Sequence, residues 1–206
     1  MPMPATESRW KRAVNGVSQT PDRKEADMDI LKGIRPLDYV LAAVMVGLAA
    51  VIALANVAAD GDAGFAHPVD SHSVLMIPVF VAAAMPILWR RRSILAVVAV
   101  SFVVLAASLP AFGWVTRCGF ALPLSFAMAY AVARFAGIRQ NHVVGLVGIL
   151  ALQIVTLVRD ASTGGLGALW LSLSIAVVCY GVGVLVQSRI QKVAAEPTLA
   201  VERVRA

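Results

Sequence analysis

Charged residues are scarce in this chain of 206 residues: Asp, Glu, Lys and Arg make up 15% of it, whereas apolar residues make up 59%. A soluble domain usually carries about 25% charged and about 45–50% apolar residues. The shortage of charge, together with a mean hydropathy of +0.79, excludes a soluble globular enzyme and a disordered chain. It predicts an integral membrane protein.

The chain also lacks the patterns from which most catalytic and metal sites are built. Its two cysteines, Cys118 and Cys179, form no metal-binding or redox motif. We place them about 16 Å apart in depth, too far for a disulfide. There is no P-loop, HExxH, GxSxG or CxxC sequence. We therefore expect no enzymatic activity, no cofactor and no bound metal.

Long stretches without charge define six candidate membrane spans. A helix needs about 17–25 residues to cross a hydrocarbon core of ~30 Å, and each stretch meets or nearly meets that length. The fourth span extends past Arg134, because an arginine near a helix end can reach the headgroups. The predicted spans are 36–59, 71–89, 93–116, 118–137, 141–158 and 166–189.

The distribution of basic residues predicts the orientation of these spans. If the spans alternate in direction, 16 of the 18 Lys and Arg residues fall on one side, and the other side keeps only Arg117 and Arg159. Basic loops favour the cytoplasm. We therefore expect an all-α, polytopic bundle of six transmembrane helices in a bacterial plasma membrane, with both termini cytoplasmic.

The same distribution explains the net charge of +6. In a soluble protein this charge would suggest nucleic acid, but here the cations border membrane spans, where they fix topology and attract anionic lipid. We expect no nucleic-acid partner. Residues 1–35 are predicted to form a basic cytoplasmic tail, disordered or partly on the membrane surface. Residues 190–206 are predicted to form a second, short tail that Pro197 interrupts.

Three sets of residues are candidates for a functional role. The longest loop combines aspartates with two histidines, which suits proton or metal sensing, although a solvated loop has much the same composition. Asp38 and Arg134 each lie about one turn from the cytoplasmic surface. The sequence leaves three interpretations of them open: an orienting ion pair, two separate interfacial side chains, or a proton relay. Small residues at every fourth position favour close helix packing, within the chain or in a dimer. The loop residues are Asp60, Asp62, His67, Asp70 and His72, and the packing face is Ser125, Ala129, Ala133 and Gly137.

Few polar residues lie inside the spans. Gln153 and Thr156 share one face of the fifth span, and Ser172 and Tyr180 share one face of the sixth. Hydrogen bonds between helices explain these residues. A transporter normally carries acidic groups near the middle of its spans, or paired broken helices, and the sequence shows neither.

Three segments, taken in order, resemble a known family. They are IRPLDYVLAA from Ile34, PILWRRRS from Pro86 and LPLSFAMAYAVAR from Leu122. Together they resemble the N-terminal membrane region of actinobacterial sensor histidine kinases of the NarL/DesK-like type, over residues 34–192. In that family an Asp near the start of the first helix is followed by an Arg-rich turn, and a later span with a Tyr ends in Arg.

The resemblance implies a six-helix sensory input region. Such kinases continue into a dimerisation domain with a phospho-accepting His and into an ATP-binding domain, but here no His follows His142. No catalytic residue of the family is therefore carried over. We expect a non-enzymatic signalling or accessory protein that contacts the lipid bilayer and pairs with itself or with a histidine kinase. The alternatives are a small transporter or transporter subunit, and the remnant of a truncated kinase gene.

Overall fold

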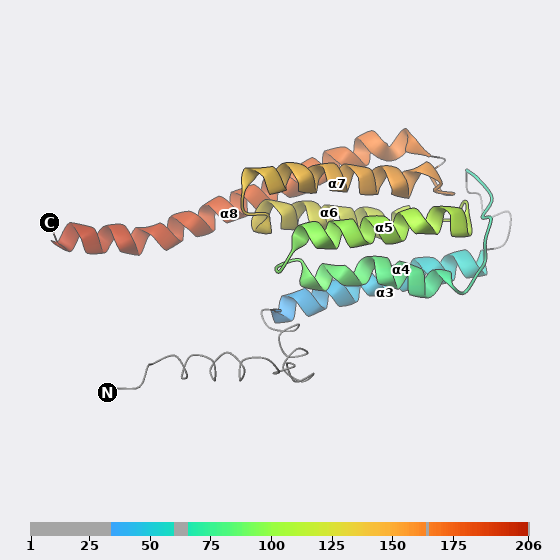
Figure 1. Ribbon diagram of the computed structural model, residues 1–206, viewed down its shortest axis with the longest axis horizontal. Coiled ribbons are helices and arrows are strands. Elements are labelled where there is room, and N and C mark those ends of the chain that lie inside the picture. The colour runs from blue at the N-terminus through green and yellow to red at the C-terminus, as the bar shows by residue number, and fades with distance from the viewer. Residues whose placement is uncertain (1–33, 60–65, 164, 206) are drawn as a thin grey trace, which may run out of the picture. The chain divides into compact units, whose positions relative to one another are not determined.

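The structure is a computed structural model that describes residues 34–59, 66–163 and 165–205 (Figure 1). All regular elements in that part of the chain are helices. A 3-10 turn, η1, follows the short helix α4, and a second one, η2, leads into the last helix. The elements are α3 (Pro36–Ala58), α4 (Met76–Ala84), η1 (Met85–Trp89), α5 (Ile94–Phe112), α6 (Cys118–Phe135), α7 (Arg139–Val158), η2 (Leu166–Ala168) and α8 (Leu169–Arg205).

Five helices are long and apolar enough to cross a membrane, and they coincide with five of the six predicted spans. The second predicted span, 71–89, is a shorter apolar helix, Met76–Trp89. It starts late because the Ser73 hydroxyl accepts a hydrogen bond from the Leu75 backbone N–H in a local turn. Its end tightens to a 3-10 turn at Pro86, which has no N–H to donate.

Consecutive helical segments run in opposite directions and pack as one bundle (Figure 1). The start of α3 meets the connection between η1 and α5, where Asp38 contacts Arg90. The end of α3 meets the connection between α5 and α6, where Asn56 contacts Thr116. We call these two ends of the bundle the Asp38 end and the Asn56 end.

Helix α6 lies at the centre of the bundle. Half of its 18 residues are buried inside the chain, compared with 17% of an apolar stretch of the same length in α8. The rings of Phe80 and Phe120 lie 4.7 Å apart in the core. Large apolar side chains are instead exposed on the outward faces of α3, α7 and α8, and a surface of this kind suits lipid rather than water. They include Val40, Val44, Val51, Val143, Val147, Trp170, Val177 and Leu185.

The predicted packing face of α6 is used within the chain. Ser125, Ala129 and Ala133 are buried, whereas Gly137 lies beyond the end of the helix, at φ +74°. A Cβ atom on Gly183 of α8 would lie 2.6 Å from the Ala133 Cβ and 2.8 Å from the Tyr130 carbonyl oxygen. Small residues thus let α6 and α8 approach closely.

Replacing Gly183 with Ala is expected to lower the free energy of unfolding by about 1–3 kcal/mol, because the added methyl group overpacks the contact between α6 and α8. The matched control is Gly181→Ala on the same helix, where a Cβ would meet nothing within 4 Å. That change should be neutral or slightly stabilising, since Ala favours a helix over Gly. Unfolding in mixed detergent micelles, followed by circular dichroism, measures the free energy of unfolding of both variants. Equal free energies for the two variants would refute the close contact.

Helix α8 is longer than the sequence predicts. It continues to Arg205, so the predicted interruption of the tail at Pro197 is wrong. A proline inside a helix removes one backbone hydrogen bond and can bend the helix without ending it. Most residues around it are good helix formers, which favours continuation. The other predicted tail, 1–35, lies almost entirely outside the described residues.

Candidate functional site

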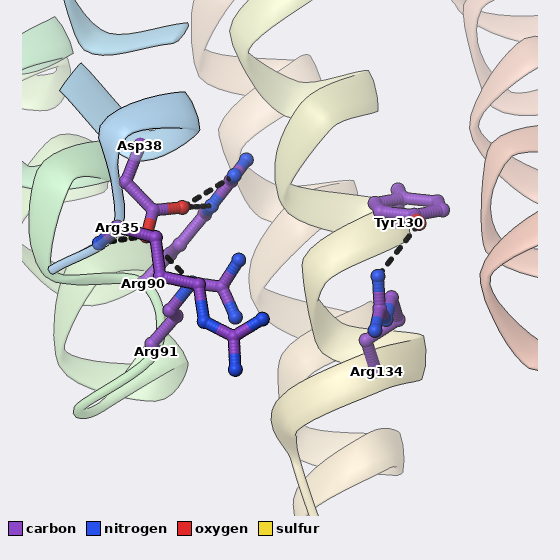
Figure 2. A network of polar contacts seen from close by, with 6 residues as sticks. All are labelled: Arg35, Asp38, Arg90, Arg91, Tyr130 and Arg134. Atoms are coloured by element: carbon purple, nitrogen blue, oxygen red, sulfur yellow. Dashed lines mark hydrogen bonds and ion pairs between the residues drawn. The ribbon is translucent and has the colours of Figure 1, made fainter. Parts of the chain in front are cut away.

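The first polar network surrounds Asp38, at the Asp38 end of the bundle (Figure 2). Its Oδ1 accepts hydrogen bonds from Arg90 Nη2 at 2.7 Å and Nε at 3.1 Å, and its Oδ2 accepts one from Arg91 Nε at 2.6 Å. Oδ2 also accepts from the Arg35 backbone N–H at 3.0 Å, a contact that caps α3. The Asp38 side chain is fully buried. One carboxylate thus joins the start of α3 to the turn before α5.

Arg134 does not join this network, so the ion pair considered between Asp38 and Arg134 does not form. Arg134 Nη1 donates to the Tyr130 hydroxyl at 3.2 Å, one helical turn back. Its guanidinium carbon lies 5.4 Å from the centroid of the Phe135 ring, and that of Arg91 lies 5.1 Å from the same centroid. The Phe135 ring therefore lies within cation–π distance of both arginines.

The second network surrounds Arg117, at the Asn56 end. This side chain is fully buried, and it donates to the carbonyl oxygens of Ser108 at 3.1 Å, Gly113 at 3.0 Å and Arg159 at 2.8 Å. Because α5 ends at Phe112, the guanidinium lies against the negative end of that helix. Burial lowers the pKa of Arg117 to about 10, so the side chain is still charged at neutral pH and keeps all its donors.

Asp160 caps the start of α6 from the connection between α7 and α8. Its Oδ2 accepts hydrogen bonds from the backbone N–H groups of Arg117 and Cys118, both at 2.7 Å. Its Oδ1 accepts from the Ser162 hydroxyl at 2.6 Å and from the Thr163 backbone N–H at 3.1 Å. A carboxylate in this position satisfies N–H groups that lack a helical partner. The α5–α6 and α7–α8 connections are thereby tied together.

The loop predicted as a sensing patch contributes packing and hydrogen bonds to this end. Asp70 Oδ2 accepts from the Trp114 backbone N–H at 2.8 Å, and the His67 ring packs on the Trp114 ring with centroids 4.0 Å apart. His72 Nδ1 lies 2.9 Å from the Asn56 carbonyl oxygen. Among the described residues, no group of three or more His, Cys, Asp or Glu side chains is placed to hold a metal ion. The positions of Asp60 and Asp62 lie outside the described residues.

The predicted hydrogen bonds between helices are confirmed in the middle of the bundle. Gln153 Nε2 of α7 donates to the Ser125 hydroxyl of α6 at 3.2 Å, and its Oε1 accepts from the Ser172 hydroxyl of α8 at 3.4 Å. Tyr180 of α8 pairs with His142 of α7 at 3.1 Å. Thr156 instead bonds within α7, to the Leu152 carbonyl. As predicted, Cys118 and Cys179 are free thiols.

Sequence reasoning missed the roles of Arg117 and Asp160. A signal was present, because Arg117 is one of only two basic residues on the side where the charge rule favours few of them. A charged side chain at the boundary of a span needs hydrogen-bond acceptors if it is buried there. Their identity follows from the folded loops, since three of the acceptors are backbone oxygens that no residue type specifies.

Comparisons of the chain with protein-family models, with curated proteins and with solved structures found no match.

Proposed function

We propose that this chain is the membrane-embedded input part of a sensor, similar to the membrane region of NarL/DesK-like histidine kinases, and that α8 is its output helix. The observation that carries the proposal is the length of α8, Leu169–Arg205, 37 residues without a break. At 1.5 Å per residue it extends about 55 Å. A hydrocarbon core of about 30 Å takes up little more than half of that length.

The contacts of α8 support transmission along it. Near its start, Ser172 bonds to Gln153 of α7, and further along Tyr180 bonds to His142 and Gly183 packs on Ala133 of α6. The helix begins just after the connection that holds Asp160. A shift of the Asn56-end network would therefore move one end of a rigid element whose other end leaves the bundle. In this role the chain itself is not an enzyme, and its partner is a second copy or a histidine kinase.

The same proposal places the Asp38 end in the cytoplasm, with six crossings of a bacterial plasma membrane. Cations gather at this end, whereas the Asn56 end has Arg117, buried against backbone oxygens, and Arg159. The segment containing Met76–Trp89 begins near Asp70, which bonds to Trp114 at the Asn56 end, and reaches Arg90 at the Asp38 end. It therefore connects the two ends of the bundle, and this supports counting the segment that contains Met76–Trp89 as the sixth crossing in the proposal.

An insertion series in α8 tests the output role. The chain through Arg205 is fused in a continuous helix to the dimerisation and ATP-binding domains of a NarL/DesK-like kinase, and alanines are added one at a time after Val193. Each insertion rotates the distal helix by about 100°. We expect autophosphorylation to rise and fall with insert length, and about seven insertions to restore the original level.

The control series places the same alanines after Gly165, before α8 begins, where they leave the register between α8 and the kinase unchanged. If autophosphorylation did not change with insert length in either series, α8 would be ruled out as the output helix. The purified chain is also reconstituted in proteoliposomes. Saturable solute flux there would replace the sensory proposal with the transporter alternative.

A further inference from the structure

A pocket of about 470 Å³ opens between α6, α7 and α8 at the Asp38 end. Helix α6 contributes Arg134, α7 contributes Arg139 and His142, and α8 contributes Tyr180 and Gln187. The pocket is distinct from the Asp38 network. Figure 2 shows Arg134 and Tyr130 together on α6, apart from the cluster that surrounds Asp38.

The charge of this pocket is not balanced by the described residues. Arg134 and Arg139 line it, and none of its lining residues is acidic. Of the acidic side chains that the structure describes, Asp38 forms ion pairs with two other arginines, and Asp70 and Asp160 lie at the Asn56 end. The pocket thus concentrates positive charge in surroundings that are partly apolar, where an anion is bound more strongly than in water.

One hydrogen-bond donor of Arg134 is unused by the described residues. The Nε atom of Arg134 is buried and has no hydrogen-bond partner among the described residues. A buried donor without an acceptor costs free energy. The guanidinium is held in place by the Tyr130 hydroxyl and by the Tyr130 and Phe135 rings. Its orientation is therefore fixed before any ligand arrives.

The surroundings of Arg134 suit a group with several oxygen atoms. Helix α7 begins at Arg139 and has no side-chain cap, so the positive end of its dipole lies at this end of the bundle. Gln187 and Ser188 of α8 add uncharged hydrogen-bonding groups. A Cβ on Gly137 would meet nothing within 4 Å, so the chain leaves space where α6 ends.

We propose that this pocket binds a phosphate group, carried by an anionic lipid headgroup or by a soluble phosphate compound. Arg134 and Arg139 supply two positive charges, and guanidinium groups match the geometry of phosphate oxygens. The site lies at the end of the bundle where cations gather, and its α8 wall includes Tyr180. Binding here stands independently of the proposed sensory role.

Two probes separate the two sources of phosphate, with the full chain used in both. Native mass spectrometry follows retention of phosphatidylglycerol against an equal amount of phosphatidylcholine. Thermal unfolding in phosphatidylcholine nanodiscs follows stabilisation by inorganic phosphate against sodium chloride of equal ionic strength. The variants are Arg134→Gln and Gln187→Glu, and the control is Lys192→Gln, which removes an exposed cation outside the pocket at the same end.

We expect one phosphate-bearing molecule per chain, with affinity about tenfold or more lower in both pocket variants and unchanged in the control. Selective retention of phosphatidylglycerol assigns the site to a lipid headgroup, and stabilisation by inorganic phosphate assigns it to a soluble compound. The proposal would be overturned if phosphatidylglycerol were not selectively retained and inorganic phosphate did not stabilise the chain. It would also be overturned if the pocket variants bound with wild-type affinity. If Arg134→Gln does not fold, Gln187→Glu decides, because it adds a negative charge without changing the side chain's size.

Discussion

Replacing Arg117 with Leu is expected to lower the free energy of unfolding by about 3–5 kcal/mol, among the largest effects of any single change in the chain. The substitution puts an apolar side chain in the buried position and leaves the carbonyl oxygens of Ser108, Gly113 and Arg159 without the guanidinium donor. It also removes the buried positive charge that attracts Asp160. Unfolding by sodium dodecyl sulfate in mixed micelles, followed by circular dichroism, measures the loss.

Two further variants separate the donor geometry from the charge. Arg117→Lys keeps the charge but not the planar fork of donors, so we expect an intermediate loss. Arg159→Gln removes the neighbouring exposed cation and leaves its backbone carbonyl in place, so it should change stability by no more than about 0.5 kcal/mol. If Arg117→Leu were no worse than Arg159→Gln, the buried network would not be what holds the Asn56 end together.

Replacing Asp38 with Asn is expected to lower the free energy of unfolding by about 3 kcal/mol or more, because it leaves Arg90 and Arg91 facing each other without a counter-charge. Asn keeps the shape of the side chain, so the loss reports charge rather than packing. The same unfolding measurement applies. Arg189→Gln, which changes an exposed cation on α8, serves as the control and should have little effect.

A double-mutant cycle assigns this effect to the ion pair. If Asp38 acts through Arg90, the loss on combining Asp38→Asn with Arg90→Gln should be smaller than the sum of the two separate losses, by about 1–3 kcal/mol. Additive losses would mean that each residue contributes through separate contacts. The Asp38 end would then lack the link between α3 and α5 that the geometry shows.

The sequence predicted the long helices well, because apolar length is a property of each segment by itself. It predicted the partner of Asp38 poorly. An ion pair between Asp38 and Arg134 is one of the alternatives that the sequence leaves open, because the two residues lie at a similar depth, but depth does not say which helices are neighbours. In the fold, the start of α3 lies beside the end of η1, so Arg90 and Arg91 reach Asp38 first. From the sequence, the three consecutive arginines indicate topology and the family resemblance, and neither identifies Asp38 as their partner.

The polar contacts at the Asn56 end could not be predicted from the sequence for a related reason. Asp160 acts on backbone N–H groups 42 and 43 residues earlier in the chain, and Arg117 acts on backbone oxygens of α5 and of the α5–α6 and α7–α8 connections. Backbone groups occur at every residue, so no pattern of side chains marks them. The packing face of α6 was predictable because small residues at intervals of four indicate a close contact, whereas its partner, Gly183, required the fold.

Membrane topology is the most direct test of the proposed arrangement, and Met76–Trp89 is its critical segment. Alkaline phosphatase, active outside the cytoplasm, and green fluorescent protein, fluorescent inside it, are fused at four points: within 60–65, after Arg92, at residue 164 and after Arg205. We predict phosphatase activity at the first and third points and fluorescence at the second and fourth. If the fusions within 60–65 and after Arg92 reported the same side, Met76–Trp89 would not cross the membrane, and α8 would leave the bundle on the side opposite to the start of α3.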